Sequence, residues 1–62
     1  MKVKEVIKLL EKDGWYLAAQ KGSHRQYKHP IKKGRATVPV HDQNKDLAKG
    51  TENSILKQAG LK

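Results

Sequence analysis

The sequence predicts an α+β domain in which two helices pack on one face of a three-stranded antiparallel sheet. Three observations support this fold: an apolar helical repeat opens the chain, short alternating segments separated by glycine and proline follow, and a second helical repeat closes it. The chain has 62 residues, which is the size of one small domain. We therefore expect residues 1–62 to form a single domain with the element order α-β-β-β-α.

The first helix is predicted by four apolar residues that fall at i, i+3, i+4 and i+7 and form one stripe: Val3, Val6, Ile7 and Leu10. Charged residues occupy most of the positions between them, as expected for the solvent-facing side of a surface helix. Asp13-Gly14 follows the stripe, and glycine suits the left-handed conformation that often comes directly after a helix. We therefore expect the helix to end there.

The first two strands are predicted from the alternation of their side chains. Residues 15–20 form the first strand, in which three residues share the face toward the helices: Trp15, Leu17 and Ala19. A tight connection at 21–23 leads to a second strand over about residues 24–29. Tyr27 is the only sizeable apolar side chain in this second strand, so we expect it to face the helices as well.

The third strand is predicted over about residues 35–40, after a turn at 30–34 that contains proline and glycine. Its inward positions alternate regularly: Ala36, Val38 and Val40. Pro39 cannot donate a backbone hydrogen bond, which favours an edge position for this strand. We expect the helices to cover one face of the sheet and to leave the other open, with these residues beneath the helices: Trp15, Leu17, Val38 and Val40.

The second helix is predicted after a polar loop over residues 41–50, in which residues 46–49 can form one helical turn. Thr51 is the expected N-terminal cap, because its hydroxyl can accept a hydrogen bond from the first turn. The apolar face of the helix consists of Ile55, Leu56 and Ala59. Gly60 is the expected stop, and Leu61 can fold back on the helix.

The composition indicates a basic protein that handles nucleic acid. Lysine and arginine number 14 against six acidic residues, a formal net charge of +8. Such an excess of positive charge favours binding to nucleic acid, because each contact with a phosphate releases counterions. The charge can also simply keep a small domain soluble. The chain has no cysteine, which excludes disulfides and cysteine-based zinc sites. No apolar segment has the length of a membrane span or a signal peptide, so we expect a soluble cytoplasmic protein that makes no membrane contact.

His24 is the candidate catalytic residue. Strand alternation places His24, Gln26 and Lys28 on one face, opposite Tyr27, and therefore on the open face or its rim. Histidine exchanges protons near neutral pH, so an imidazole there could take the proton of a ribose 2′-hydroxyl while a nearby cation stabilises the anionic phosphorane. Such cleavage needs no metal or other cofactor. The alternative is that this is an isolated surface histidine without function.

The expected RNA contacts are the residues around His24: Lys21, Gly22, Ser23, Arg25 and Lys28. Lys28 is the first choice for holding the phosphate, ahead of Lys21 and Arg25. The turn at 32–35 is equally well interpreted as a phosphate contact or as a solvated hairpin tip. His29 is interpreted as a hydrogen-bonding residue at a strand end, and Trp15 as a core residue. The histidine and aspartates of 41–46 match no known zinc or calcium spacing.

Several of these residues together resemble the HicA toxin family, and the likeness covers nearly the whole chain: Gly22-Ser23-His24, Tyr27, His29-Pro30, 49–51 and 55–61. The resemblance implies a double-stranded-RNA-binding-domain-like fold and a ribosome-independent mRNA interferase, the toxin of a type II toxin–antitoxin pair. It places the catalytic histidine on His24. It also implies a HicB-type antitoxin that covers the active face, with operator DNA contacted only through that partner. The chain departs from many relatives, which carry leucine and arginine where it has Glu52 and Asn53.

The alternative function is a non-catalytic double-stranded-RNA-binding module. Such modules carry a lysine cluster at the start of the second helix, where it contacts phosphates across the major groove. The corresponding segment here, residues 46–52, has one lysine and two acids. The composition of this segment therefore favours the nuclease. A third hypothesis is that the chain acts mainly as one half of a complex that controls its own operon, although it contains no pattern of a helix-turn-helix DNA reader.

Overall fold

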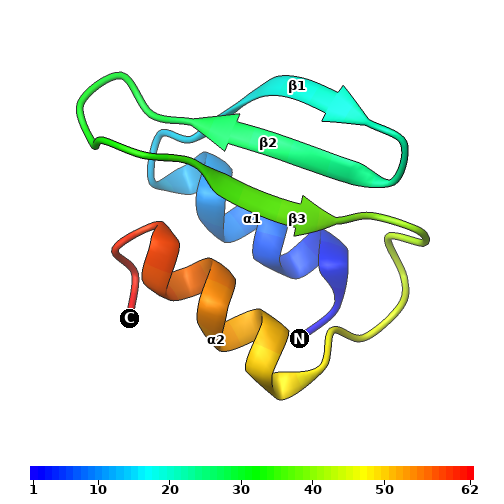
Figure 1. The fold of residues 1–62 in the computed structure, drawn as a ribbon. Coiled ribbons are helices and arrows are strands. Elements are labelled where there is room, and N and C mark those ends of the chain that lie inside the picture. The colour runs from blue at the N-terminus through cyan, green and yellow to red at the C-terminus, as the bar shows by residue number, and fades with distance from the viewer.

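A computed structural model describes all 62 residues and confirms the α+β fold with the order α-β-β-β-α. Its elements are α1 Val3–Lys12, β1 Tyr16–Lys21, β2 His24–Lys28, β3 Ala36–Pro39 and α2 Lys49–Gln58. The three strands form one antiparallel meander in the order β1-β2-β3, and both helices lie on the same side of it (Figure 1). Neither helix has the length and apolar character needed to cross a membrane.

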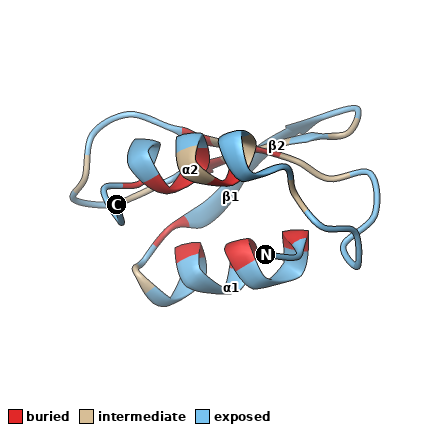
Figure 2. Ribbon diagram, turned by 90° about the horizontal axis from the view of Figure 1, so that it is seen from below, coloured by how far each residue is buried: buried red, intermediate tan, exposed pale blue.

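The hydrophobic core lies between the helices and the sheet. All four residues of the apolar stripe on α1 are buried, as predicted, and the buried residues of each helix follow one side of it (Figure 2). The other core members come from the sheet, the α1–β1 junction and α2: Trp15, Tyr27, Ala36, Val38, Ile55 and Ala59. Val40 is half-buried and packs against this cluster. The inward positions predicted for β2 and β3 are thus confirmed.

The prediction for β1 is wrong at two positions. Leu17 pairs with Tyr27 but remains 48% exposed, because β1 is an edge strand and the helices pack chiefly beneath β3. Ala19 pairs with Gln26 on the open face, since a β-bulge shifts the register between Leu17 and Ala19. A bulge adds one residue to one strand and reverses the alternation beyond it, so simple period-two counting places Ala19 on the wrong face.

The start of α2 also differs from the prediction. The helix begins at Lys49 with Ala48 at the N-cap position, and Thr51 lies within the first turn. Residues 46–48 are not helical, because the segment before α2 pairs with the beginning of the chain: the Leu47 amide donates to the carbonyl of Met1 at 2.9 Å. No strand boundary shifts by more than one residue, and β3 occupies the edge position that Pro39 predicts.

Candidate active site

His24 is the first residue of β2 and lies on the open face of the sheet. It is opposite Lys21 on β1 and Pro39 on β3. Tyr27, three residues along the strand, is only 1% exposed and points into the core, so alternation directs His24 away from the helices. The His24 side chain is exposed, and the ring nitrogens that hydrogen-bond within the protein are those of His29. The imidazole is therefore free to exchange a proton with a ligand.

The hairpin between β1 and β2 fixes the backbone at His24. Only Gly22 and Ser23 separate the strands, and Gly22 has φ 55, which fits the glycine position that opens a type II′ turn. The carbonyl of Ser23 accepts a hydrogen bond from the Val40 amide at 2.5 Å, which ties the hairpin to the end of β3. Apart from Gly22 itself and its two neighbours in the chain, no residue has an atom within 4 Å of where a Cβ on Gly22 would be, so the space beside the turn is open to a ligand.

Three cations accompany His24 on the open face. The bulge in β1 turns Lys21 onto this face, where it pairs directly with His24. Lys28 is exposed on the same face of β2, four residues from His24, or about 13 Å along the strand. Arg35 Nη1 donates to Oε1 of Gln26 at 3.1 Å, which holds its guanidinium above the centre of the sheet. The open face therefore combines an imidazole that has no partner within the protein with three positively charged side chains, of which Lys21 is its direct neighbour.

The sequence predicts Arg35 only as part of a basic turn, because the place of Arg35 on the sheet depends on the register of β2 against β3. Arg25 is expected as an RNA contact close to His24 in the chain, but strand alternation turns its side chain to the other face, toward α1. The predicted phosphate contacts are therefore divided between two sides of the sheet. Lys21 and Lys28 share the face of His24, whereas Arg25 does not.

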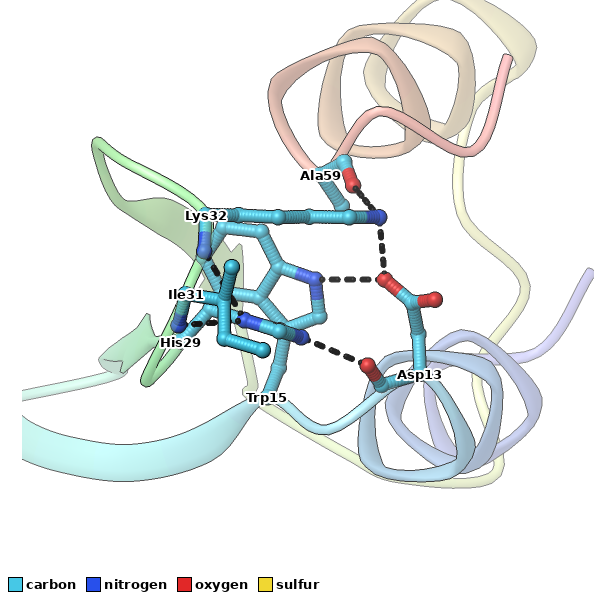
Figure 3. A network of polar contacts seen from close by, with 6 residues as sticks. All are labelled: Asp13, Trp15, His29, Ile31, Lys32 and Ala59. Carbon is cyan, nitrogen blue, oxygen red and sulfur yellow. Dashed lines mark hydrogen bonds and ion pairs between the residues drawn. The ribbon is translucent and has the colours of Figure 1, made fainter.

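His29 has the structural role that its place at the strand end predicted (Figure 3). Its Nε2 donates to the carbonyl of Asp13 at 2.6 Å, and its Nδ1 accepts from the amides of Ile31 and Lys32, each at 3.0 Å. The ring also meets Trp15 edge-on, with centroids 5.3 Å apart. A Cβ on Gly14, which has φ +104, would lie 2.7 Å from His29 Nε2, so only glycine fits at this junction.

Lys32 completes the same network and joins it to α2. Its Nζ forms an ion pair with Oδ2 of Asp13 at 2.5 Å and donates to the carbonyl of Ala59 at 3.0 Å. Trp15 Nε1 donates to the same Asp13 oxygen at 3.2 Å. The Lys32 hydrogen bond, followed by its positive charge, lowers the pKa of the Asp13 carboxyl below its ordinary value of 3.8. Lys32 therefore links the two helix ends within the protein.

The lowered pKa of Asp13 predicts an acid-dependent loss of stability. A carboxyl whose pKa is lower in the folded state than in the unfolded state stabilises the fold above its ordinary pKa, and this contribution disappears as the pH falls through the folded-state pKa. We expect Asp13→Asn to lower the urea midpoint at pH 7, and its difference from the wild-type chain to begin to narrow below about pH 4. Urea unfolding followed by circular dichroism between pH 7 and 3 measures this, and a difference that widens toward acid would contradict it.

The histidines, aspartates and glutamates of the chain form no group of three that could hold a metal ion.

A comparison with protein families matches residues 3–61 to the family described as HicA toxin of bacterial toxin–antitoxin. The match spans both helices and all three strands. A comparison with curated proteins gives no match.

Proposed function

The chain belongs to the HicA toxin family, and we propose on this basis that it is the toxin of a type II toxin–antitoxin system and an endoribonuclease that cleaves mRNA. The observation that carries the proposal is the exposed His24 imidazole, which has no hydrogen-bond partner within the protein, lies opposite Lys21 and shares its sheet face with Lys28 and Arg35. A proton acceptor beside positive charge is what an RNA phosphodiester needs for attack by its own 2′-hydroxyl.

In the proposed reaction, His24 accepts the proton of the ribose 2′-hydroxyl as the 2′-oxygen attacks the adjacent phosphorus. The new bond between the 2′-oxygen and phosphorus forms while the bond to the 5′-oxygen breaks, and the departing oxygen takes up a proton. The products are a 2′,3′-cyclic phosphate and a 5′-hydroxyl. Lys21, which lies directly opposite His24, stabilises the negative charge that builds on the phosphorane oxygens. The proposed reaction needs no metal ion or other cofactor.

The hairpin supplies the close approach that this reaction requires. Gly22 and Ser23 carry little side-chain bulk beside His24, and the space next to Gly22 is open. An RNA backbone can therefore come near the turn without displacing protein atoms. Lys28, about 13 Å from His24 along β2, is placed to contact a neighbouring phosphate of the same strand.

The proposed partner is a HicB-type antitoxin that covers the open face and so blocks access to His24. A chain with a net charge of +8 favours a partner with an acidic surface. The proposed site of action is the cytoplasm, where mRNA is found, and any contact with operator DNA is made by the antitoxin.

The test is incubation of the purified chain with single-stranded RNA in the presence of EDTA. We expect cleavage that EDTA does not reduce, and arrest of growth on expression in a host cell that co-expression of the antitoxin relieves. An RNA that is bound but stays intact, together with normal host growth, would favour the non-catalytic RNA-binding module instead.

A further inference from the structure

Arg25 contains an unsatisfied polar atom within the fold. Its Nε is buried and has no hydrogen-bond partner, and it is the only buried side-chain nitrogen or oxygen in the chain of which this is true. A buried N–H without a partner is unfavourable in a folded protein. Neither of the two ion pairs in the protein includes Arg25. Within the protein, the Arg25 Nε therefore has no acceptor and the guanidinium has no ion-pair partner.

Arg25 lines a hollow of about 380 Å³ between β2 and α1. Its other lining residues come from α1 and from the loop before α2: Lys4, Ile7, Lys8, Glu11 and Gln43. The Lys4 amide donates to the carbonyl of Gln43 at 3.0 Å, which holds the loop against the first turn of α1. Because one water molecule occupies about 30 Å³ of liquid, the hollow has room for a group much larger than water.

The charge of this hollow is suited to an anion. Three cations and one carboxylate line it, which leaves a formal charge of +2. Lys4 and Lys8 lie one helical turn apart on α1, and like charges at this spacing repel each other. A guanidinium offers several N–H donors in a fixed fork, which matches the oxygens of a phosphate.

We propose that this hollow binds a phosphate of the RNA substrate outside the scissile bond. The inference rests on the proposed function. Arg25 directly follows His24 in the chain, but the two side chains lie on opposite sides of β2 near the same hairpin. An RNA strand that crosses His24 can therefore pass around the hairpin and place a later phosphate against Arg25 and Lys8. Arg25 and the open face then hold different nucleotides of one RNA.

Glu11 is the acidic residue at this site, and it gives the proposal a reciprocal test. Its carboxylate repels a phosphate, so Glu11→Gln is expected to strengthen RNA binding. If Glu11 instead serves to neutralise Arg25 within the protein, the same substitution would lower stability without any gain in RNA affinity. The two variants Arg25→Gln and Glu11→Gln should therefore change RNA affinity in opposite directions.

The experiment measures RNA binding in chains that carry His24→Ala, so that the RNA is not cut. The probe is a fluorescent single-stranded RNA of about twelve nucleotides, a length typical of such binding sites. We expect Arg25→Gln to weaken binding about tenfold and to reduce the slope of log affinity against log salt by about 0.7, as for one lost phosphate contact. Lys8→Gln, an exposed change in the same hollow, should act in the same direction if Arg25→Gln does not fold.

The matched control is Lys57→Gln, which removes one positive charge from an exposed position on α2. It should change the affinity less than twofold. Equal losses for Lys57→Gln and Arg25→Gln would overturn the proposal, because overall charge alone would then explain them. If no His24→Ala chain binds RNA at all, the proposed function fails together with the hollow. If RNA is bound and Arg25→Gln has no effect, only the hollow fails.

Nitrogen NMR gives a direct readout of the same contact. The chain has two arginines, Arg25 and Arg35, so only two Nε–H signals need to be assigned, and Arg25→Lys identifies one of them. We expect RNA to shift the Arg25 signal. A signal that responds to an acidic peptide but not to RNA would overturn the proposal and assign the hollow to a protein partner.

Discussion

Replacing His24 with alanine is expected to slow RNA cleavage by about 10²–10⁴-fold, the usual contribution of a general acid or base. The imidazole is the one group on the open face placed to take the proton of a 2′-hydroxyl. Because the side chain is exposed and makes no hydrogen bond within the protein, its loss should leave the fold unchanged. Single-turnover cleavage of single-stranded RNA in EDTA measures the rate, and circular dichroism checks the fold.

The control for this variant is His41→Ala, which removes another exposed histidine from the loop after β3. It should cleave RNA at the wild-type rate. His29→Ala is unsuitable as a control because His29 holds the α1–β1 junction to the turn after β2. A His24→Ala chain that folds and cleaves RNA as fast as the wild-type chain would exclude His24 from the reaction.

Replacing Tyr27 with alanine is expected to remove most of the stability of the domain. Tyr27 is the largest fully buried side chain, and truncating a buried aromatic residue costs about 3–5 kcal/mol. At about 0.05–0.15 kcal/mol per residue, a domain of this length has roughly 3–9 kcal/mol in total. Urea unfolding should therefore show Tyr27→Ala to be unfolded or close to its midpoint in buffer, and RNA cleavage should be lost with the fold.

Tyr27→Phe is the matched control, because it keeps the ring in the core and should cost less than about 1.5 kcal/mol. Together the two variants test whether burial of this ring sets the orientation of β2. If Tyr27→Ala has the same urea midpoint as the wild-type chain, burial of the Tyr27 ring does not determine the face on which His24 lies.

Much of this fold follows from local patterns in the sequence. The apolar stripe of α1 predicts its buried face, since a helix with one such stripe has one way to cover it. In β2 a single large apolar residue, Tyr27, decides which side faces the core, and the alternation then places His24 outside. The position of the candidate catalytic residue was predictable for that reason.

Features that depend on contacts between distant segments were not predictable in this way. The bulge in β1 turns Lys21 toward His24, yet nothing in residues 16–21 shows that an extra residue is accommodated there. The first turn of α2 packs against the beginning of the chain, where the amino-terminal ammonium of Met1 contacts Oε1 of Glu52 at 2.7 Å. This contact gives Glu52 a structural role, and it lowers the pKa of that carboxyl.

His24, in β2, and His29, directly after β2, show why residue type alone does not assign function. His29 has both ring nitrogens engaged by backbone groups and packs against Trp15, so it acts as a structural residue. His24 has neither constraint and faces solvent beside cations. The pattern of partners, rather than the presence of an imidazole, separates the candidate catalyst from the structural residue.

The most direct test of the proposed chemistry is the identity of the RNA ends that the chain produces. Attack by the 2′-hydroxyl with His24 as base leaves a 2′,3′-cyclic phosphate, or the 3′-phosphate formed from it, on one fragment and a 5′-hydroxyl on the other. Mass spectrometry of the fragments made in EDTA distinguishes these ends, and we expect to find them. Fragments that end in a 3′-hydroxyl and a 5′-phosphate would mean that water attacks the phosphorus, and they would contradict the proposed mechanism.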